Sequence, residues 1–346
     1  MTNNQKNSAF DSKEQHSGQG RDSASLRFFL SNEFGLIVLV VFFAIIFSTL
    51  SPAFLSKFSL YTLGRTSAVN IMIGFSMMVV IITGGLNLSV GAIGVSSAMF
   101  GGWLMQAFGI PWVPAVLGGL AMGAFLGALN GIIIVQSGLH SFIITLATMS
   151  IFFGIMIYLT QAESYREISP TFAAFGRMKI QGVVSPLLIV TLSVGILLSV
   201  LFRLTSLGRS ILAAGANPMA AELSGIRVNL TITYCHILSG ILAGAAGMML
   251  VARTGAAIPS MAGQLGQDWL LPAFLGPVLG GTLLTGGRVS VLGTLLGSFL
   301  VTMLTSGLLL MQVGAFWIQT YLGLLLLAAV LIDLARRRYL KRRNLV

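Results

Sequence analysis

Charged residues are scarce in this chain of 346 residues: only 8% are Asp, Glu, Lys or Arg, whereas 55% are hydrophobic. Charge that sparse cannot cover the surface of a water-soluble globule of this size. The sequence therefore predicts an all-α integral membrane protein. The formal net charge of +11 does not indicate a nucleic-acid partner, because the basic residues cluster at the ends of apolar runs and in the C-terminal tail.

Residues that carry catalysis or bind metals are also few. Cys235 is the only cysteine, so no intrachain disulfide can form. The histidines His16, His140 and His236 are separated by long stretches and form no metal-ligand pattern. No lysine follows a glycine, which excludes the GxxxxGK[ST] phosphate-binding loop. We therefore expect no enzyme active site, no metal site and no cofactor in this chain, and any ATP must be bound by a partner subunit.

Acidic side chains are missing from the middle of the apolar segments. Glu222 lies in a polar connecting segment, and Asp268 and Asp333 lie at the ends of apolar segments. Proton- and ion-coupled carriers commonly keep ionisable groups within their membrane spans. This absence argues against a self-contained secondary carrier or channel, which remains the less favoured alternative.

About ten apolar segments approach the roughly 20 helical residues that a bilayer crossing needs. They cover residues 34–50, 68–83, 88–108, 113–135, 143–160, 184–202, 231–251, 269–284, 291–311 and 316–332. Residues 1–32 are polar and predict a disordered tail. The predicted organisation is thus this tail, a transmembrane domain over residues 33–335, and a basic tail over residues 336–346.

Basic residues predict the orientation of the spans. A cytoplasmic N-terminus places Arg203, Arg209 and Arg227, together with the basic C-terminal tail, on the inside, and it leaves a minority of Lys and Arg outside. An even number of spans then puts both termini and the polar segment 205–229 in the cytoplasm.

Glycine recurs at four-residue spacing in several spans. Gly119, Gly123, Gly127 and Gly131 share one face of a predicted helix, and Gly240 with Gly244 repeats the pattern. Small residues at this spacing let helix backbones approach closely in lipid. We interpret these glycines as packing surfaces.

The stretch GGLNLSVG, Gly84–Gly91, leaves almost no room for a loop between two spans. The two leading glycines interrupt a helix, and Asn87 can cap the start of the next one. A broken helix would present free N–H groups to a polar solute at membrane depth, whereas the alternative is a tight cytoplasmic hairpin. The candidate residues of a substrate pathway are Gly84, Gly85, Asn87, Ser89 and Gly91.

The segment 205–229 is the only long interior stretch that is neither apolar nor acidic. Asn217 followed by Pro218 predicts a helix start, and Gly225 predicts its end. The short helix between them carries small side chains, which suits docking into a groove of another protein; an ordinary polar connector is the alternative. The candidate docking residues are Gly215, Asn217, Pro218, Ala220, Ala221, Glu222 and Gly225.

Three motifs together resemble one known family. GGLNLSVG, then GLHSFIITLATM from Gly138 to Met149, then AAGANPMAAELSGI from Ala213 to Ile226 are similar to the permease subunits of ribose-type bacterial ABC importers. This is the carbohydrate-uptake branch, which also includes the autoinducer-2 permeases. The resemblance runs from about Phe34 to Asp333.

The resemblance implies a multi-pass subunit of the bacterial inner membrane that translocates a small sugar or sugar-like solute. It implies a second permease subunit, identical or related, two cytoplasmic ATPase subunits into which the segment Gly215–Gly225 docks, and a soluble solute-binding protein. A branched-chain amino acid permease belongs to the same superfamily and remains an alternative. Asn87 stands where the family usually has Asp, and Met219 stands where the wider docking motif has Glu.

Overall fold

The computed structural model describes residues 32–314, 317–328 and 331. Almost all of the predicted N-terminal tail and the whole basic tail, residues 336–346, lie outside these described residues, as does part of the last predicted span. The described chain folds into helices without any strand, and its only β pairings are isolated bridges. This confirms the predicted all-α architecture.

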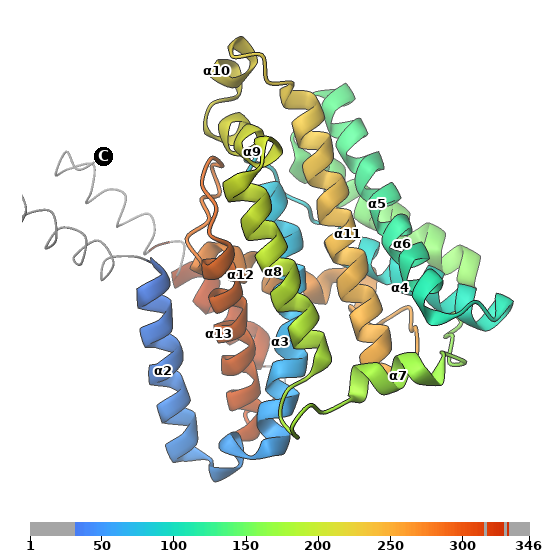
Figure 1. The fold of residues 1–346 in the computed structure, drawn as a ribbon, viewed down its shortest axis with the longest axis vertical. Coiled ribbons are helices and arrows are strands. Elements are labelled where there is room, and N and C mark those ends of the chain that lie inside the picture. Colours follow the sequence, from blue (N-terminus) through green and yellow to red (C-terminus); the bar gives the residue numbers. More distant parts are fainter. Residues whose placement is uncertain (1–31, 315–316, 329–330, 332–346) are drawn as a thin grey trace, which may run out of the picture.

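The helices follow one another with short connections (Figure 1). Their bounds are α2 Asn32–Leu50, η1 Pro52–Leu55, α3 Lys57–Ile81, α4 Val90–Phe108, α5 Trp112–Ser137, α6 Ser141–Thr160, α7 Pro170–Arg177, α8 Pro186–Leu204, α9 Ser206–Ala216, α10 Pro218–Leu223, α11 Val228–Thr254, η2 Gln264–Trp269, α12 Leu270–Leu279 and α13 Val291–Leu310.

Within the described residues, seven helices are long and apolar enough to cross a membrane, namely α2, α3, α5, α6, α8, α11 and α13. Three other predicted spans are not among them. α4 has 19 residues, α12 has only 10 residues and contains Pro277, and the described part of the last span is a shorter apolar helix, Trp317–Ala328. A multi-pass membrane protein is thus established, while the number ten stays a prediction.

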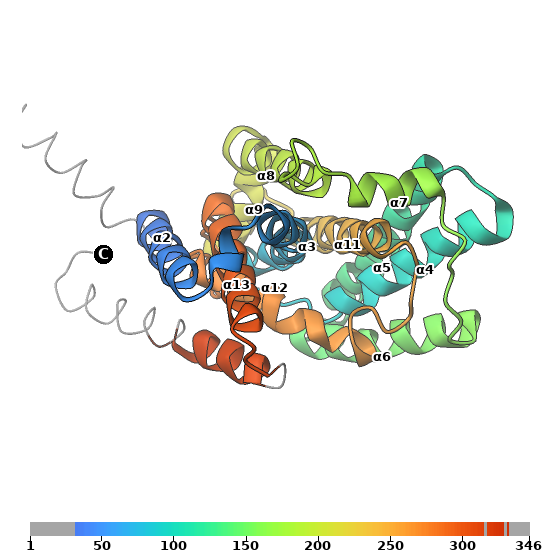
Figure 2. The same ribbon diagram turned by 90° about the horizontal axis from the view of Figure 1, so that it is seen from below.

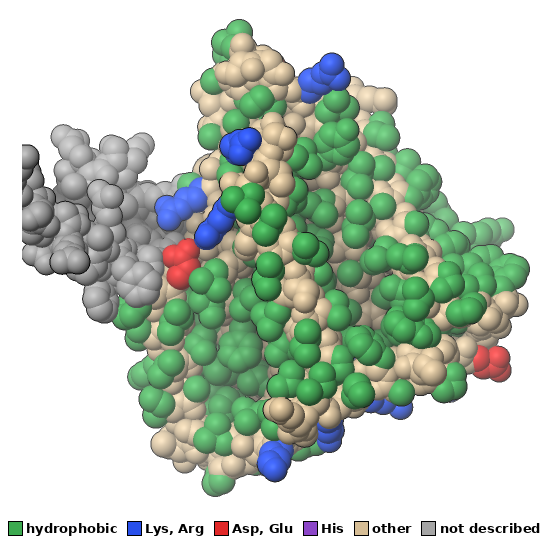
Figure 3. Space-filling view, in the orientation of Figure 1, with side chains coloured by type: hydrophobic (Ala, Val, Ile, Leu, Met, Phe, Trp, Pro, Cys, Tyr) green, Lys and Arg blue, Asp and Glu red, His purple; other side chains and the backbone are tan. Residues whose placement is uncertain are grey.

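α3 and α11 form the centre of the bundle and are the most buried of the seven (Figures 1 and 2). α2 lies at one edge, where Leu36 and Phe47 pack with Leu300 and Met303 of α13. On the face seen in Figure 3, hydrophobic side chains cover most of the surface between an upper and a lower group of Lys and Arg. That distribution is the one expected of a protein whose sides face lipid.

The glycines of α5 pack against α11, as their spacing predicts. A Cβ atom at Gly123 would collide with the carbonyl oxygen of Gly240, and one at Gly127 would collide with that of His236. A Cβ atom at Gly131 would lie 2.8 Å from the Cα atom of Thr233. The two backbones therefore touch directly over several turns, which holds α4 and α5 against α11.

Candidate functional site

The helical path is interrupted where GGLNLSVG lies. α3 ends at Ile81, α4 begins at Val90, and Gly84 has a φ of +77° between them. α4 packs on α5, α6 and α11 and hardly touches α3. Segment 82–89 is therefore a break between diverging helices, and the tight hairpin that the sequence also allowed is not formed.

Asn87 occupies the centre of a buried polar network in this break. Its Nδ2 atom donates to Oγ of Ser239 at 3.0 Å, and its Oδ1 atom accepts from N and Oγ of Ser89 at 3.1 and 2.7 Å. Asn130 donates to Oγ of Ser89 at 2.7 Å, and Ser76 donates to the carbonyl of Ser239 at 2.8 Å. All five side chains are fully buried. The network joins the break to α3, α5 and α11.

The backbone of the break is held by α6. The amide of Leu86 donates to Oγ of Ser141 at 2.8 Å, and that of Leu88 donates to Oγ1 of Thr145 at 3.1 Å. A backbone amide without a hydrogen-bond partner is costly where no water is available. The two hydroxyl groups replace the hydrogen bonds that a continuous helix would supply. Ser141 and Thr145 stand one turn apart in the motif GLHSFIITLATM. This spacing places both hydroxyl groups on one face of α6, and it is the sequence feature that could have indicated a shared hydrogen-bonding role.

Three side-chain atoms beside this network have no hydrogen-bond partner within the described residues. Oδ1 of Asn130 is buried and accepts no hydrogen bond, and the same holds for both ring nitrogens of His236 on α11. Buried polar atoms without a partner are uncommon. Asn130 itself belongs to the network, and His236 lies one turn before Ser239 on α11, so these unpaired polar atoms adjoin the network along the chain.

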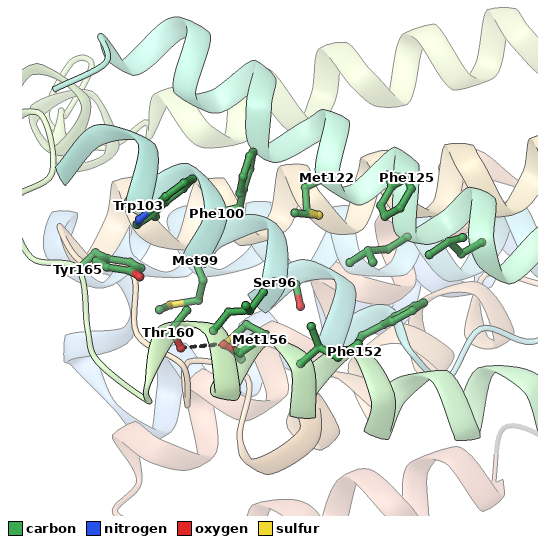
Figure 4. Close-up of a pocket in the computed structure, with 14 residues that line it drawn as sticks. Ser96, Met99, Phe100, Trp103, Met122, Phe125, Phe152, Met156, Thr160 and Tyr165 are labelled. Carbon is green, nitrogen blue, oxygen red and sulfur yellow. Dashed lines mark hydrogen bonds between the residues drawn. The ribbon is translucent and has the colours of Figure 1, made fainter. Parts of the chain in front are cut away.

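Two cavities of the described structure are lined by other residues. One, of about 520 Å³, lies between α4, α5 and α6, and Figure 4 shows Met99, Phe100, Phe125 and Phe152 around it. The other, of about 500 Å³, lies between α8 and α13. Both are mostly apolar and suit hydroxylated solutes poorly. Asn87 and Ser89 line neither cavity and are fully buried, whereas Gly84 and Gly85 are half-buried.

The other predicted pathway residues are glycines at close approaches. A Cβ atom at Gly85 would lie 3.2 Å from Oγ of Ser141, and one at Gly91 would collide with the backbone of Gly266 in η2. The structure thus brings Gly84, Gly85, Asn87 and Ser89 together in the break, while Gly91 marks the crossing of α4 with η2. Their assignment to a substrate pathway stays a prediction.

The short helix predicted in segment 205–229 is present as α10, which projects with α9 at one end of the bundle (Figure 1). Oδ1 of Asn217 accepts from the amide of Ala220 at 3.1 Å, and Pro218 is the first helical residue. Gly225 follows with a φ of +82°. The predicted start and end of the helix are confirmed, and Gly215 lies buried in the last turn of α9.

The exposed face of α10 differs from the small-residue face that the sequence indicated. Ala221 is 4% exposed, because it packs on Ala214 of α9 and Val228 of α11. Ala220 and Glu222 are exposed, and Met219 and Leu223 protrude with 75% and 86% of their surface accessible. Met219 and Leu223 are therefore the large exposed side chains of α10, and sequence reasoning did not single them out.

Comparison with known proteins gives one family. Residues 59–334 match the sequence model of the family described as "Branched-chain amino acid transport system / permease component". No solved structure matches the chain significantly.

Curated relatives are similar over most of their length. The ribose import permease protein of Bacillus subtilis (strain 168) is 37% identical over 302 residues, which cover 86% of this chain and 90% of the relative. The D-allose transport system permease protein of Escherichia coli (strain K12) is 35% identical, with 87% and 91% covered. The fructose import permease protein of Rhizobium meliloti is 33% identical, with 86% and 84% covered.

Proposed function

Since this chain belongs to the family of branched-chain amino acid transport system permease components, we propose that it is the membrane-spanning permease subunit of a bacterial ABC importer for a small sugar or sugar-like solute. The observation that carries the proposal is the similarity to permeases named for ribose, D-allose and fructose import. These matches run over most of both chains, so the resemblance is to the whole permease and not to one motif.

The family description names branched-chain amino acids, and that solute is the second candidate. The named relatives favour a sugar over it. The polar core supports the same choice, because Asn87, Ser89, Asn130 and Ser239 are all uncharged. Neutral amides and hydroxyls suit the hydroxyl groups of a sugar better than the charged ends of an amino acid.

The importer requires other subunits. We assign ATP binding and hydrolysis to a separate cytoplasmic ATPase subunit, because this sequence contains no GxxxxGK[ST] loop. A soluble binding protein delivers the solute, and a second permease subunit, identical or related, completes the translocation unit. No cofactor or metal is assigned to this chain.

We place the protein in the bacterial inner membrane. Both termini, including the tails 1–32 and 336–346, are assigned to the cytoplasm. About ten spans make up the permease domain, residues 33–335. The support is the basic residues Arg203, Arg209 and Arg227, which lie on or beside α9, α10 and the adjoining helix ends. Basic residues are enriched on the cytoplasmic side of membrane proteins. The same end carries α10, so α10 faces the ATPase.

The docking surface of α10 comprises Met219, Ala220, Glu222 and Leu223, all exposed. Asn217, Pro218 and Gly225 hold this helix in shape, and Gly215 and Ala221 attach it to the bundle. Met219 and Leu223 stand one helical turn apart and are both strongly exposed, and a contiguous exposed apolar patch marks a site of protein contact. ATP-driven closure of the ATPase would move α10 and open the translocation pathway alternately to the two sides.

Gly84, Gly85, Asn87, Ser89 and Gly91 border the pathway in this proposal. Asn87 and Ser89 are fully buried, so the proposal requires the surrounding helices to move before a solute can reach them. A broken helix is the arrangement by which transporters hold polar solutes at membrane depth, and the interruption at Gly84 supports it.

The test is uptake by vesicles that contain the permease with its ATPase subunits and receive the binding protein from outside. We expect ATP-dependent uptake of one of ribose, allose or fructose, and no competition by leucine. Uptake of leucine in place of sugars would support the second candidate. Flux through the permease alone, without ATPase or ATP, would show a self-contained carrier or channel instead.

A further inference from the structure

Three backbone stretches that are distant in the sequence meet at the end of the bundle that carries α9 and α10. They are Ile82 just after α3, Gly215 in the last turn of α9, and Gly286 with Gly287 in the loop between α12 and α13. The amide of Gly287 donates to the carbonyl oxygen of Ile82 at 2.9 Å. These four residues are called the glycine junction below.

The glycine junction has no space for a side chain. A Cβ atom at Gly215 would collide with the carbonyl oxygen of Ile82 and would lie 2.7 Å from N of Gly287. A Cβ atom at Gly286 would lie 2.8 Å from the carbonyl oxygens of both Gly215 and Ile82. One at Gly287 would lie 2.7 Å from Cα of Ala216. Backbone therefore meets backbone directly at each contact.

Direct backbone contact makes the glycine junction stiff. A side chain between two segments absorbs small displacements by changing its rotamer, whereas backbone atoms in contact cannot, and packed interiors have low compressibility. Ile82 is fully buried, so other residues surround it on all sides. A shift of α9 must therefore move Ile82, the loop before α13, or both.

On one side, the glycine junction is attached to α10. Ala214, next to Gly215, forms a buried cluster with Ala221 of α10 and Val228 of α11. The amide of Asn217 also donates to the carbonyl of Ala213 at 3.1 Å, which continues α9 up to the first residue of α10. Displacement of α10 is thus carried into the last turn of α9.

On the other side, the glycine junction leads to two interruptions of the membrane helices. Ile82 begins the break 82–89, whose amides at Leu86 and Leu88 are held by α6. Gly287 lies shortly before Ser290, which caps α13 by accepting from the amide of Gly293 at 2.9 Å. Figure 1 shows this loop beside α9.

We propose that the glycine junction transmits the displacement of α10 to the break 82–89 and to the start of α13, and that Gly215 is the positioning residue of this link. The inference rests on the proposed function, because a partner must move α10. It adds the route by which ATP hydrolysis, outside this chain, reaches the segment that contains Asn87.

The test compares Gly215→Ala with the matched variant Gly154→Ala, a helix position where a Cβ atom meets nothing within 4 Å. Each is assembled with the ATPase subunits and binding protein in vesicles, and solute uptake and ATP hydrolysis are measured together. We expect Gly215→Ala to assemble and hydrolyse ATP but to transport about tenfold less solute per ATP, since residues on a coupling route alter coupling without touching either site. Gly154→Ala should match the wild type. An unchanged ratio in Gly215→Ala would overturn the inference.

Hydrogen exchange of the wild-type complex keeps the inference testable if Gly215→Ala does not fold. The amide of Gly287 donates to the carbonyl oxygen of Ile82 at 2.9 Å, so its exchange rate reports whether the glycine junction stays closed. This amide should be equally protected without nucleotide and with a non-hydrolysable ATP analogue, because the joined segments move as one body. Loss of protection in one of the two states would contradict the inference.

The two proposals fail differently. If the wild-type complex shows no ATP-dependent uptake, the proposed function itself is contradicted. If the wild-type complex transports and a folded Gly215→Ala variant behaves like Gly154→Ala, only the role of the glycine junction is contradicted.

Discussion

The hydrogen bond between Asn87 and Ser239 ties the break to α11, and a double-mutant cycle measures its strength. The bond spans 3.0 Å between two fully buried side chains that are 152 residues apart. Ser239→Ala leaves Nδ2 of Asn87 without an acceptor. Ser76 keeps its bond to the carbonyl of Ser239 at 2.8 Å in this variant, but its contact with Oγ of Ser239 at 3.0 Å is lost together with the Asn87 bond.

Two magnitudes bound the expected effect. A buried donor left unpaired costs about 1–3 kcal/mol, whereas hydrogen bonds between membrane helices average about 0.6 kcal/mol and reach about 1.7 kcal/mol in double-mutant cycles. We expect Ser239→Ala to lower the free energy of unfolding by about 1–2 kcal/mol. Asn87→Ala should cost about 2–4 kcal/mol, because Ser89 also loses its acceptor and a small cavity opens.

The assay is reversible unfolding in mixed micelles, followed by tryptophan fluorescence, for both single variants and the double variant. The coupling energy should be about 1 kcal/mol. Ser193→Ala is the control, because Ser193 is exposed and donates only to Ile189 one turn earlier on its own helix. Additive effects of Asn87→Ala and Ser239→Ala, or a Ser239→Ala loss no larger than that of the control, would refute the reasoning.

Three further substitutions test packing and docking. Gly127→Leu should separate α5 from α11 and cost about 3 kcal/mol or more by overpacking, measured by unfolding, while Gly154→Leu should be neutral because its surroundings are empty. Ala221→Leu should lower stability and uptake because Ala221 is buried, whereas exposed Ala220→Leu should leave stability unchanged; equal stabilities would contradict the orientation of α10. Leu223→Asp should leave the permease folded but weaken ATPase binding about 10–100-fold, which corresponds to the free energy of burying one leucine side chain. A pull-down titration measures this affinity, and an unchanged value would contradict docking through this face.

Local patterns predicted the local features well. The four-residue spacing from Gly119 to Gly131 predicted close packing because a helix places such residues on one face. Asn217 with Pro218, and Gly225, predicted the bounds of α10 because capping depends only on neighbouring backbone groups. The paired glycines Gly84 and Gly85 predicted that the helix is interrupted here, but they left open whether it forms a broken helix or a tight hairpin.

Features set by distant parts of the chain could not be predicted. The partners of Asn87 and Ser89, which are Ser239 and Asn130, come from other helices far along the sequence. Side-chain size suggested that Ala221 faces outward, but the positions of α9 and α11 decide which side of a short helix is buried.

The span near residues 269–284 was also beyond prediction from hydropathy. Within it only residues 270–279 form the short helix α12, which contains Pro277, and Gly281 follows with a φ of +79°. Leu265 and Gly266, just before the span in η2, also have positive φ. Hydropathy alone does not report such an interruption, because it counts apolar residues without regard to backbone geometry.

The central claim, that a separate ATPase drives this permease through α10, is tested most directly by a cross-link from position 223. Leu223 is the more exposed of the two large apolar side chains of α10, with 86% of its surface accessible. A Leu223→Cys, Cys235→Ala permease, assembled in vesicles with its ATPase subunits and treated with a short bifunctional thiol-to-amine reagent, should yield a product that contains both subunits. Labelling of Cys at position 223 by an impermeant reagent from the side of the binding protein, with no product that contains the ATPase, would contradict the account.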